Sequence, residues 1–238
     1  MAQATMAGKV AGAAANYALA KLPAVASSAL SGNLLRLMDL AIDGYGKLPS
    51  VKNSAGKLFQ RRQQVSLAAE SLIRHHTIAA AAQGAITNIG GLFTAVIGTP
   101  ANITGIIVTQ IRLAAGLAHI HGYDIDDRRV RTAVAMCLLG ERELSRQLAK
   151  GQLPTTPLAV ATSPVFDPSL YQEVAQRVMS NLLRDAAGKG LASTIARKAP
   201  LIGGGVGGAV DGFDTYMVSR CVRRQLPLRR ATAPIQVA

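Results

Sequence analysis

The residues that could hold a metal ion gather in one stretch, "HIHGYDIDD" at 119–127. It contains two histidines and three aspartates: His119, His121, Asp124, Asp126 and Asp127. Two helical histidines converge on a zinc ion when they lie about four positions apart, and here they are two apart, so a helix splays them. Asp126 is placed to cap the following helix, and Asp127 to favour its positive end. The pattern therefore indicates a helix boundary, and we predict no metal site.

Patterns for covalent catalysis are missing from the sequence. No serine lies in a G-x-S-x-G turn with a histidine and an acid to follow. Cys137 and Cys221 both lie in apolar helical patterns, without a neighbouring base and without metal-ligand or disulfide spacing. Their use is typical of a reducing cytosol. We assign no catalytic residue and no cofactor, and an enzyme whose residues are scattered along the chain stays an open alternative.

The glycine-rich segment "LIGGGVGGAVDGFDTY" at 201–216 allows three interpretations. Its letters fit a dinucleotide fingerprint, but no buried strand precedes them, as that fold requires. On a helical wheel the small residues form a stripe that lets another backbone approach closely. The candidate packing residues are Gly204, Gly205, Gly208 and Gly212, followed by Thr215 and Ser219. A tight crossing in a bundle and a membrane-inserting helix both fit, although Asp211 and Asp214 oppose deep insertion.

The segment "RCVRRQLPLRR" at 220–230 holds five arginines in eleven residues, and the whole chain carries a net charge of +13. It is either a solvated end or a contact for an anionic surface. Recognition of nucleic acid favours interleaved aromatic residues, which this segment lacks, whereas acidic lipid attracts each cation by about 1 kcal/mol. We therefore predict anionic-lipid contacts at Arg220, Arg223, Arg224, Arg229 and Arg230.

Residues 75–111 contain no Asp, Glu, Lys or Arg. The apolar stretch 77–111 is interrupted at "NIGG" and "GTPAN", so no piece reaches the ~20 residues of a membrane span. Pro100 should stop or kink a helix there. We expect a helical hairpin turning at 98–102, either buried in the protein or inserted shallowly in a bilayer.

Helical periodicity also organises the rest of the chain. The helix after Thr104 carries a narrow polar line on an otherwise apolar surface, which is typical of a central packed helix. We name this line, Thr109, Arg112 and His119, the polar seam. Further helices are predicted at 33–45, through Leu58–Leu72, at 126–140, at 141–150, from Pro168 to Gly188, and up to Pro200, with turns at 44–56 and a Pro-rich loop at 151–168.

Two stretches together resemble the EcsC family. "GTPANITGIIVTQIRLAAGLAHIHGYDIDDRRVRTAVAMCLLG" (98–140) is similar to its apolar segment, Gln-x-Arg helix and Gly-Tyr-Asp turn, and "KAPLIGGGVGGAVDGFDTYMVSR" (198–220) to its closing helix. The resemblance divides the chain into an Ala-rich extension (1–54), an EcsC-like domain (55–225) with an insert at 151–168, and a tail (226–238). It implies a helical, bacterial, often membrane-associated protein with no established catalytic residues.

These observations predict an all-α protein, a compact multi-helix bundle with a central apolar hairpin and a glycine-rich C-terminal helix. The expected function is a non-catalytic accessory or scaffold protein, cytoplasmic and peripherally membrane-associated, that docks on anionic lipid or a membrane complex. A pore-forming or membrane-disrupting protein is one alternative. A basic nucleic-acid-binding protein is the other.

Overall fold

A computed structural model describes residues 34–89, 99–196 and 200–229. Within these ranges the chain is all-α, as predicted, and its one β-type pairing is an isolated bridge between Tyr45 and Leu48. The helices are α3 (Leu34–Asp43), α4 (Val51–Arg62), α5 (Val65–Ile89), α7 (Thr99–Ile120), α8 (Arg128–Cys137), α9 (Gly140–Ala149), α10 (Pro157–Ala161), α11 (Pro168–Ala196) and α12 (Pro200–Gln225).

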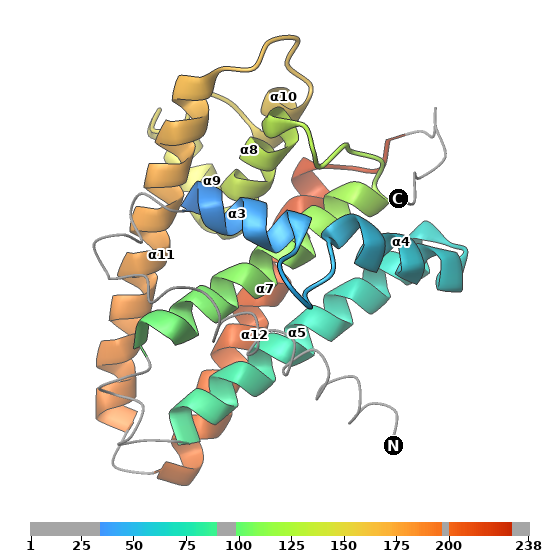
Figure 1. Cartoon of the computed structure of the whole chain (residues 1–238). Helices are drawn as coiled ribbons and strands as arrows, with labels where there is room; N and C mark the ends of the chain where they lie inside the picture. Colours follow the sequence, from blue (N-terminus) through green and yellow to red (C-terminus); the bar gives the residue numbers. More distant parts are fainter. Residues whose placement is uncertain (1–33, 90–98, 197–199, 230–238) are drawn as a thin grey trace.

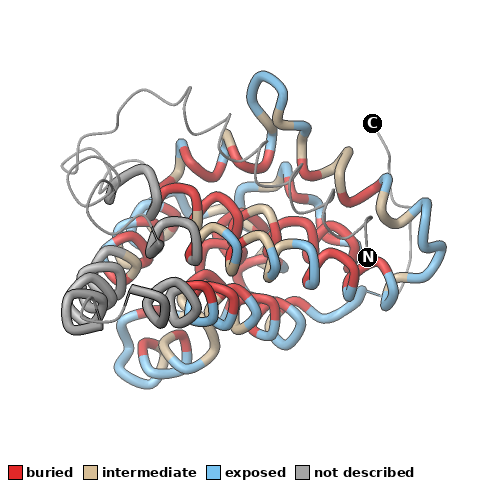
Figure 2. The backbone as a smooth tube through the Cα atoms, turned by 90° about the horizontal axis from the view of Figure 1, so that it is seen from below, coloured by how far each residue is buried: buried red, intermediate tan, exposed pale blue. Residues whose placement is uncertain are grey.

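Helix α7 lies at the centre of the bundle (Figure 1). Its residues Ile111, Leu113 and Leu117 are fully buried. Helices α5 and α12 run side by side and both pack on α7, while α3 and α4 pack on it from another direction. Buried backbone therefore runs through the middle of the molecule, with exposed turns around it (Figure 2). The prediction of a central packed helix after Thr104 is confirmed.

The two apolar arms are both helical, since α5 covers 77–89 and α7 covers 99–111. The predicted turn at 98–102 is wrong, because Thr99 and Pro100 begin α7. Proline fits the first helical turn, where its missing N–H has no helical partner to lose. The connection 90–98 lies outside the described residues. Residues 104–111 are almost wholly buried in the bundle, and among the described helices none is long and apolar enough to cross a membrane.

The N-terminal part of the fold departs from prediction at two boundaries. The expected turn at 44–56 ends early because Ser50 Oγ accepts the N–H of Asn53 (3.2 Å) and starts α4 at Val51. The single helix expected through Leu58–Leu72 is two helices. Gln63 takes a left-handed conformation (φ 58°) and its N–H bonds to Phe59 O, which ends α4. The predicted division between residues 54 and 55 falls inside α4, and α3 packs on α7.

Three further differences concern where helices begin and end. Asp127, not Asp126, caps α8, because its side chain accepts the N–H of Arg129 (2.8 Å). The loop at 151–168 contains α10, which Thr156 caps and which packs on α8. Helix α11 continues to Ala196 through the glycines at 188 and 190, because a helical glycine costs only about 1 kcal/mol and does not end a helix alone.

Candidate functional site

The small residues of α12 lie against α5. Gly208 and Gly212 are buried, and a Cβ added at Gly212 would lie 3.1 Å from Ala81 Cβ and 3.5 Å from Thr77 O. Further along α12, Thr215 and Ser219 are fully buried. Gly204 and Gly205 are in the same helix, but their surroundings lie outside the described side chains. In the described part the stripe therefore makes a tight helix crossing inside the bundle.

A different face of α12 is exposed. Along it lie Ala209, Phe213, Tyr216, Arg220 and Arg223, which recur at intervals of four and three and so share one side of the helix. Phe213 is 61% exposed and Tyr216 is 44% exposed. We call these five residues the α12 face. It is apolar and aromatic in the middle of the helix and cationic toward its C-terminal end.

The predicted arginine contacts divide into three groups. Arg220 and Arg223 are exposed and have no acidic partner among the described residues. Arg224 pairs with Glu141 of α9. Arg229 is also exposed, and its guanidinium lies 5.5 Å from the ring centre of Tyr123. Arg230 lies outside the described residues. Arg220, Arg223 and Arg229 are thus exposed without an acidic partner among the described residues, and of these three Arg220 and Arg223 lie on the α12 face.

The "HIHGYD" motif anchors the chain after α12. His121 Nδ1 donates to Leu226 O (2.6 Å), and Tyr123 Oη donates to Pro227 O (3.1 Å). The N–H of Arg229 donates to His121 O (3.0 Å), and Leu226 is fully buried. Burial lowers the pKa of His121, so its neutral form makes these contacts. The start of the predicted tail, 226–229, is therefore docked on the turn between α7 and α8.

The polar seam lies inside the molecule. Thr109 Oγ1 donates to Gly105 O (2.9 Å) within α7. Arg112 crosses to α3 and α4, where it donates to Ala41 O (2.6 Å) and Ser54 Oγ (3.2 Å). Burial lowers the pKa of Arg112 to about 10. The seam joins three helices, and it does so with a guanidinium bonded to neutral oxygens.

His119, at the end of the seam, is buried, and its Nε2 atom has no hydrogen-bond partner in the part of the chain that the structure describes. Burial and the nearby Lys52 lower the pKa of His119. Lys52 pairs with Asp126 and lies 3.6 Å from Asp124. In the described chain no group of three potential metal ligands comes together, and the acids of this motif serve capping and ion pairs.

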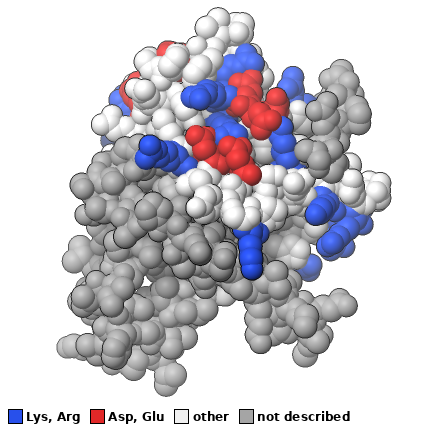
Figure 3. Space-filling model, in the orientation of Figure 1, with Lys and Arg blue, Asp and Glu red and all other residues white. Residues whose placement is uncertain are grey.

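A cluster of ion pairs joins α8 to α3. Arg131 donates to Asp39 (2.5 Å), to Asp43 (2.6 Å) and to Ile125 O (2.9 Å). Burial alone lowers the pKa of Arg131, but the hydrogen bonds and charges of the two aspartates outweigh it and raise that pKa. These contacts hold the two helices together, and both aspartates are paired with Arg131 rather than free to act as an acid or a base. Acidic and basic side chains accordingly lie close together on the face shown in Figure 3.

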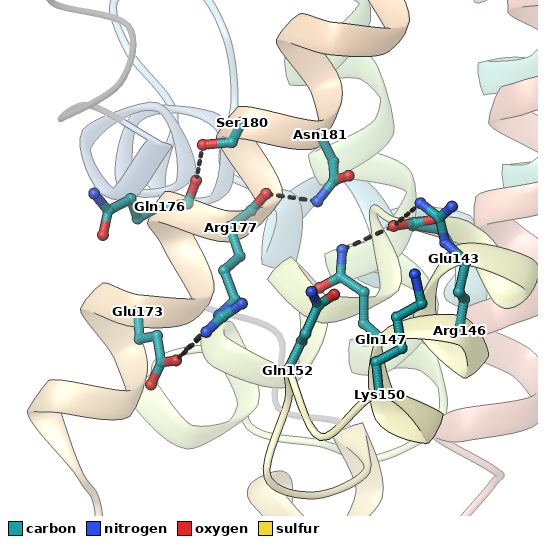
Figure 4. A pocket seen from close by; sticks show the side chains of 10 residues that line it. All are labelled: Glu143, Arg146, Gln147, Lys150, Gln152, Glu173, Gln176, Arg177, Ser180 and Asn181. Carbon is teal, nitrogen blue, oxygen red and sulfur yellow. Dashed lines mark hydrogen bonds and ion pairs between the residues drawn. The ribbon is translucent and has the colours of Figure 1, made fainter.

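A polar groove between α9 and α11 was not predicted (Figure 4). Its volume is about 640 Å³, and every described residue that lines it is polar. The lining residues are Glu143, Arg146, Gln147, Lys150, Gln152, Glu173, Gln176, Arg177, Ser180 and Asn181. The lining residues of α9 recur at helical spacing and therefore share one side of that helix, and the lining residues of α11 share one side of α11 in the same way. The polar side of each helix could be found in the sequence, but nothing in the sequence indicated that the polar sides of α9 and α11 face each other.

Comparisons with known proteins add no relative. The chain matches no family model, and neither the curated proteins nor the solved structures include a match. The resemblance to the EcsC family therefore stays a prediction, and function has to be argued from the geometry described above.

Proposed function

We propose that this protein is a non-catalytic accessory or scaffold protein that docks on an anionic membrane surface through the α12 face. The observation that carries the proposal is the juxtaposition, on one exposed side of α12, of Phe213 and Tyr216 with the uncompensated Arg220 and Arg223. Cytoplasmic location and kinship with the bacterial EcsC family belong to the same proposal.

The chemistry of this face fits a lipid headgroup region. Aromatic side chains favour the membrane–water interface, where the ring leaves water and the polar edge stays hydrated. Each arginine near anionic lipid contributes about 1 kcal/mol. The net charge of +13 adds long-range attraction to the same surface. The buried 104–111 arm supports docking through α12 rather than through the predicted hairpin.

Vesicle flotation tests the proposal. At low salt we expect the full chain to float with vesicles of phosphatidylcholine and phosphatidylglycerol, and not with phosphatidylcholine alone. The R220Q/R223Q variant should bind about 10- to 30-fold more weakly, because it loses about 2 kcal/mol. Phe213→Ser should weaken binding without changing the net charge.

The matched control is R128Q/R142Q, which removes the same charge at two exposed arginines of α8 and α9. It should keep most of the binding. Equal losses in both double variants would reject the α12 face as the docking site, and no flotation at low salt would reject the function itself. Release of trapped dye would favour the membrane-disrupting alternative. A salt-sensitive gel shift with nucleic acid, in a chain that ignores vesicles, would favour the nucleic-acid alternative.

A further inference from the structure

We propose that the groove between α9 and α11 binds a small hydroxylated anion, a phosphate or carboxylate on a polyol skeleton, either free or as the headgroup of a lipid. The groove is separate from the α12 face, so this proposal stands independently of the one above.

The shape is set by the packing of two helices that line the groove from opposite sides (Figure 4). Helices α9 and α11 each pack on α8 and on α12, and the space between them is left open. Its volume, about 640 Å³, lies within the range of small-molecule sites. Because the described lining residues are all polar, an apolar ligand would gain little there and would desolvate many polar groups.

The charge of the groove comes from two internal ion pairs and one extra cation. Glu143 pairs with Arg146 on α9 (2.6 Å), and Glu173 pairs with Arg177 on α11 (2.7 Å). Lys150 also lines the groove and has no acidic partner among the described residues. Lys150 is exposed, and among the described lining residues it adds one positive charge to the two ion pairs. An anionic group on the ligand would complement it.

Gln147 supplies a buried acceptor. Its side chain is 3% exposed, and its Nε2 atom donates to Glu143 Oε1 (2.9 Å). Since a carboxylate can only accept, this bond fixes the orientation of the amide and leaves Oε1 as the free acceptor. Oε1 is buried and accepts no hydrogen bond from the described residues. An unsatisfied buried acceptor costs about 1–3 kcal/mol, and a ligand hydroxyl would remove that cost.

Two further amides complete the groove. The side chains of Gln152 and Gln176 line it and make no hydrogen bond with the described residues. Ser180 is not available, because its hydroxyl donates to Gln176 O (2.8 Å). Amides both donate and accept, so they suit neighbouring hydroxyl groups on one skeleton. The ligand therefore carries its anionic group toward Lys150 and its hydroxyls toward the three glutamines.

Calorimetric titration of the full chain with myo-inositol 1-phosphate tests the proposal, with myo-inositol and inorganic phosphate titrated separately. We expect the combined molecule to bind at least about tenfold more tightly than either half, because each half makes only part of the contacts. Lys150→Gln should weaken binding about tenfold. Lys57→Gln removes an equal charge from exposed α4 and should leave binding unchanged.

Gln147→Leu removes the acceptor and should weaken binding as well, and its unfolding midpoint without ligand shows whether the variant is folded. Flotation with vesicles of phosphatidylinositol in phosphatidylcholine distinguishes a lipid headgroup from a free molecule as the ligand. Flotation that depends on Lys150 identifies a headgroup. Binding of the free molecule in the titration, without flotation, identifies a free ligand. The proposal is overturned if the wild-type chain binds neither the free molecule at about 10 mM nor those vesicles. It is also overturned if Lys150→Gln binds as well as the wild type.

Discussion

At the scale of single residues, three histidines have lowered pKa values: His119 and His121 are buried, and His76 is half-buried. His76 Nδ1 donates to Leu72 O (2.9 Å) within α5. Burial, with a smaller contribution from the charge of Arg112, lowers the pKa of His76 to about 4 against the opposing effect of that hydrogen bond. Burial also lowers the pKa values of His119 and His121. These side chains are neutral in the folded protein at neutral pH.

We predict that the folded state loses stability as the pH falls from about 6.5 toward 4. The folded pKa of His76 lies below the unfolded value of 6.5, so in this window the unfolded chain binds more protons and acid favours it. Urea unfolding at pH 7, 6 and 5 measures the change. His76→Gln keeps a donor for Leu72 O and does not titrate, so it should flatten the fall. An equally steep fall in His76→Gln would contradict the assignment to His76.

At the scale of helices, the spacing of apolar residues in the sequence predicted which side of each helix is buried. Val130, Val134 and Leu144 lie on the inner faces of α8 and α9 as their spacing predicted, and all three are buried. Tyr171 and Val178 on α11 are buried in the same way. Apolar residues at helical spacing must leave water, so the sequence alone locates most helices and their buried sides.

The errors arose where single contacts decide the outcome. One hydroxyl, that of Ser50, starts α4 within an apparent turn, and one left-handed residue, Gln63, separates α4 from α5. Tyr45 continued the pattern of α3 but is 51% exposed, because the helix ends at Asp43 and Gly44 takes a positive φ of 87°. Competing local hydrogen bonds of similar strength leave no periodic signal.

The candidate sites were predictable only in part, for a related reason. The arginines at the end of α12 could be found as a basic run in the sequence, and the polar seam could be predicted from the helical spacing of its residues on α7. The groove needed the relative placement of α9 and α11, which no local pattern contains. Similarly, nothing in the sequence paired the histidine motif at 119–123 with Leu226 and Pro227, about a hundred positions later.

The crossing of α5 and α12 provides the second prediction. Gly212→Leu should lower the free energy of unfolding by about 1–3 kcal/mol, because even a Cβ would come within 3.1 Å of Ala81 Cβ and the rest of the side chain would push the helices apart. Ala209→Leu adds similar bulk on the exposed face of the same helix and should cost little. Chemical denaturation of both variants measures the difference. If Gly212→Leu were as stable as Ala209→Leu, the close crossing would be wrong.

At the scale of the whole molecule, packing brings together residues far apart in the chain. Cys137 of α8 and Cys221 of α12 are both fully buried. Their thiols share a hydrogen bond, which with burial raises the pKa of Cys137 well above its usual range. The sequence placed each cysteine in an apolar helix face but did not pair them. A reagent therefore reaches these thiols only when α8 and α12 separate.

We predict that the two thiols report the opening of the entire bundle. In native buffer at pH 8, a disulfide reagent such as dithiobis(nitrobenzoate) should react slowly, since it needs an exposed thiolate and both cysteines are buried. In denaturant both thiols should react rapidly, giving the two equivalents expected from the sequence. The reaction rate should rise with denaturant concentration in parallel with unfolding measured by circular dichroism. The reason is that α12 packs on α5, α7, α8, α9 and α11 and cannot leave α8 without breaking several interfaces.

Cys137→Ser tests the remaining thiol, which should still react slowly because its protection comes from burial rather than from its partner. Rapid reaction of either thiol in native buffer would mean that α12 opens locally, independently of the rest of the bundle.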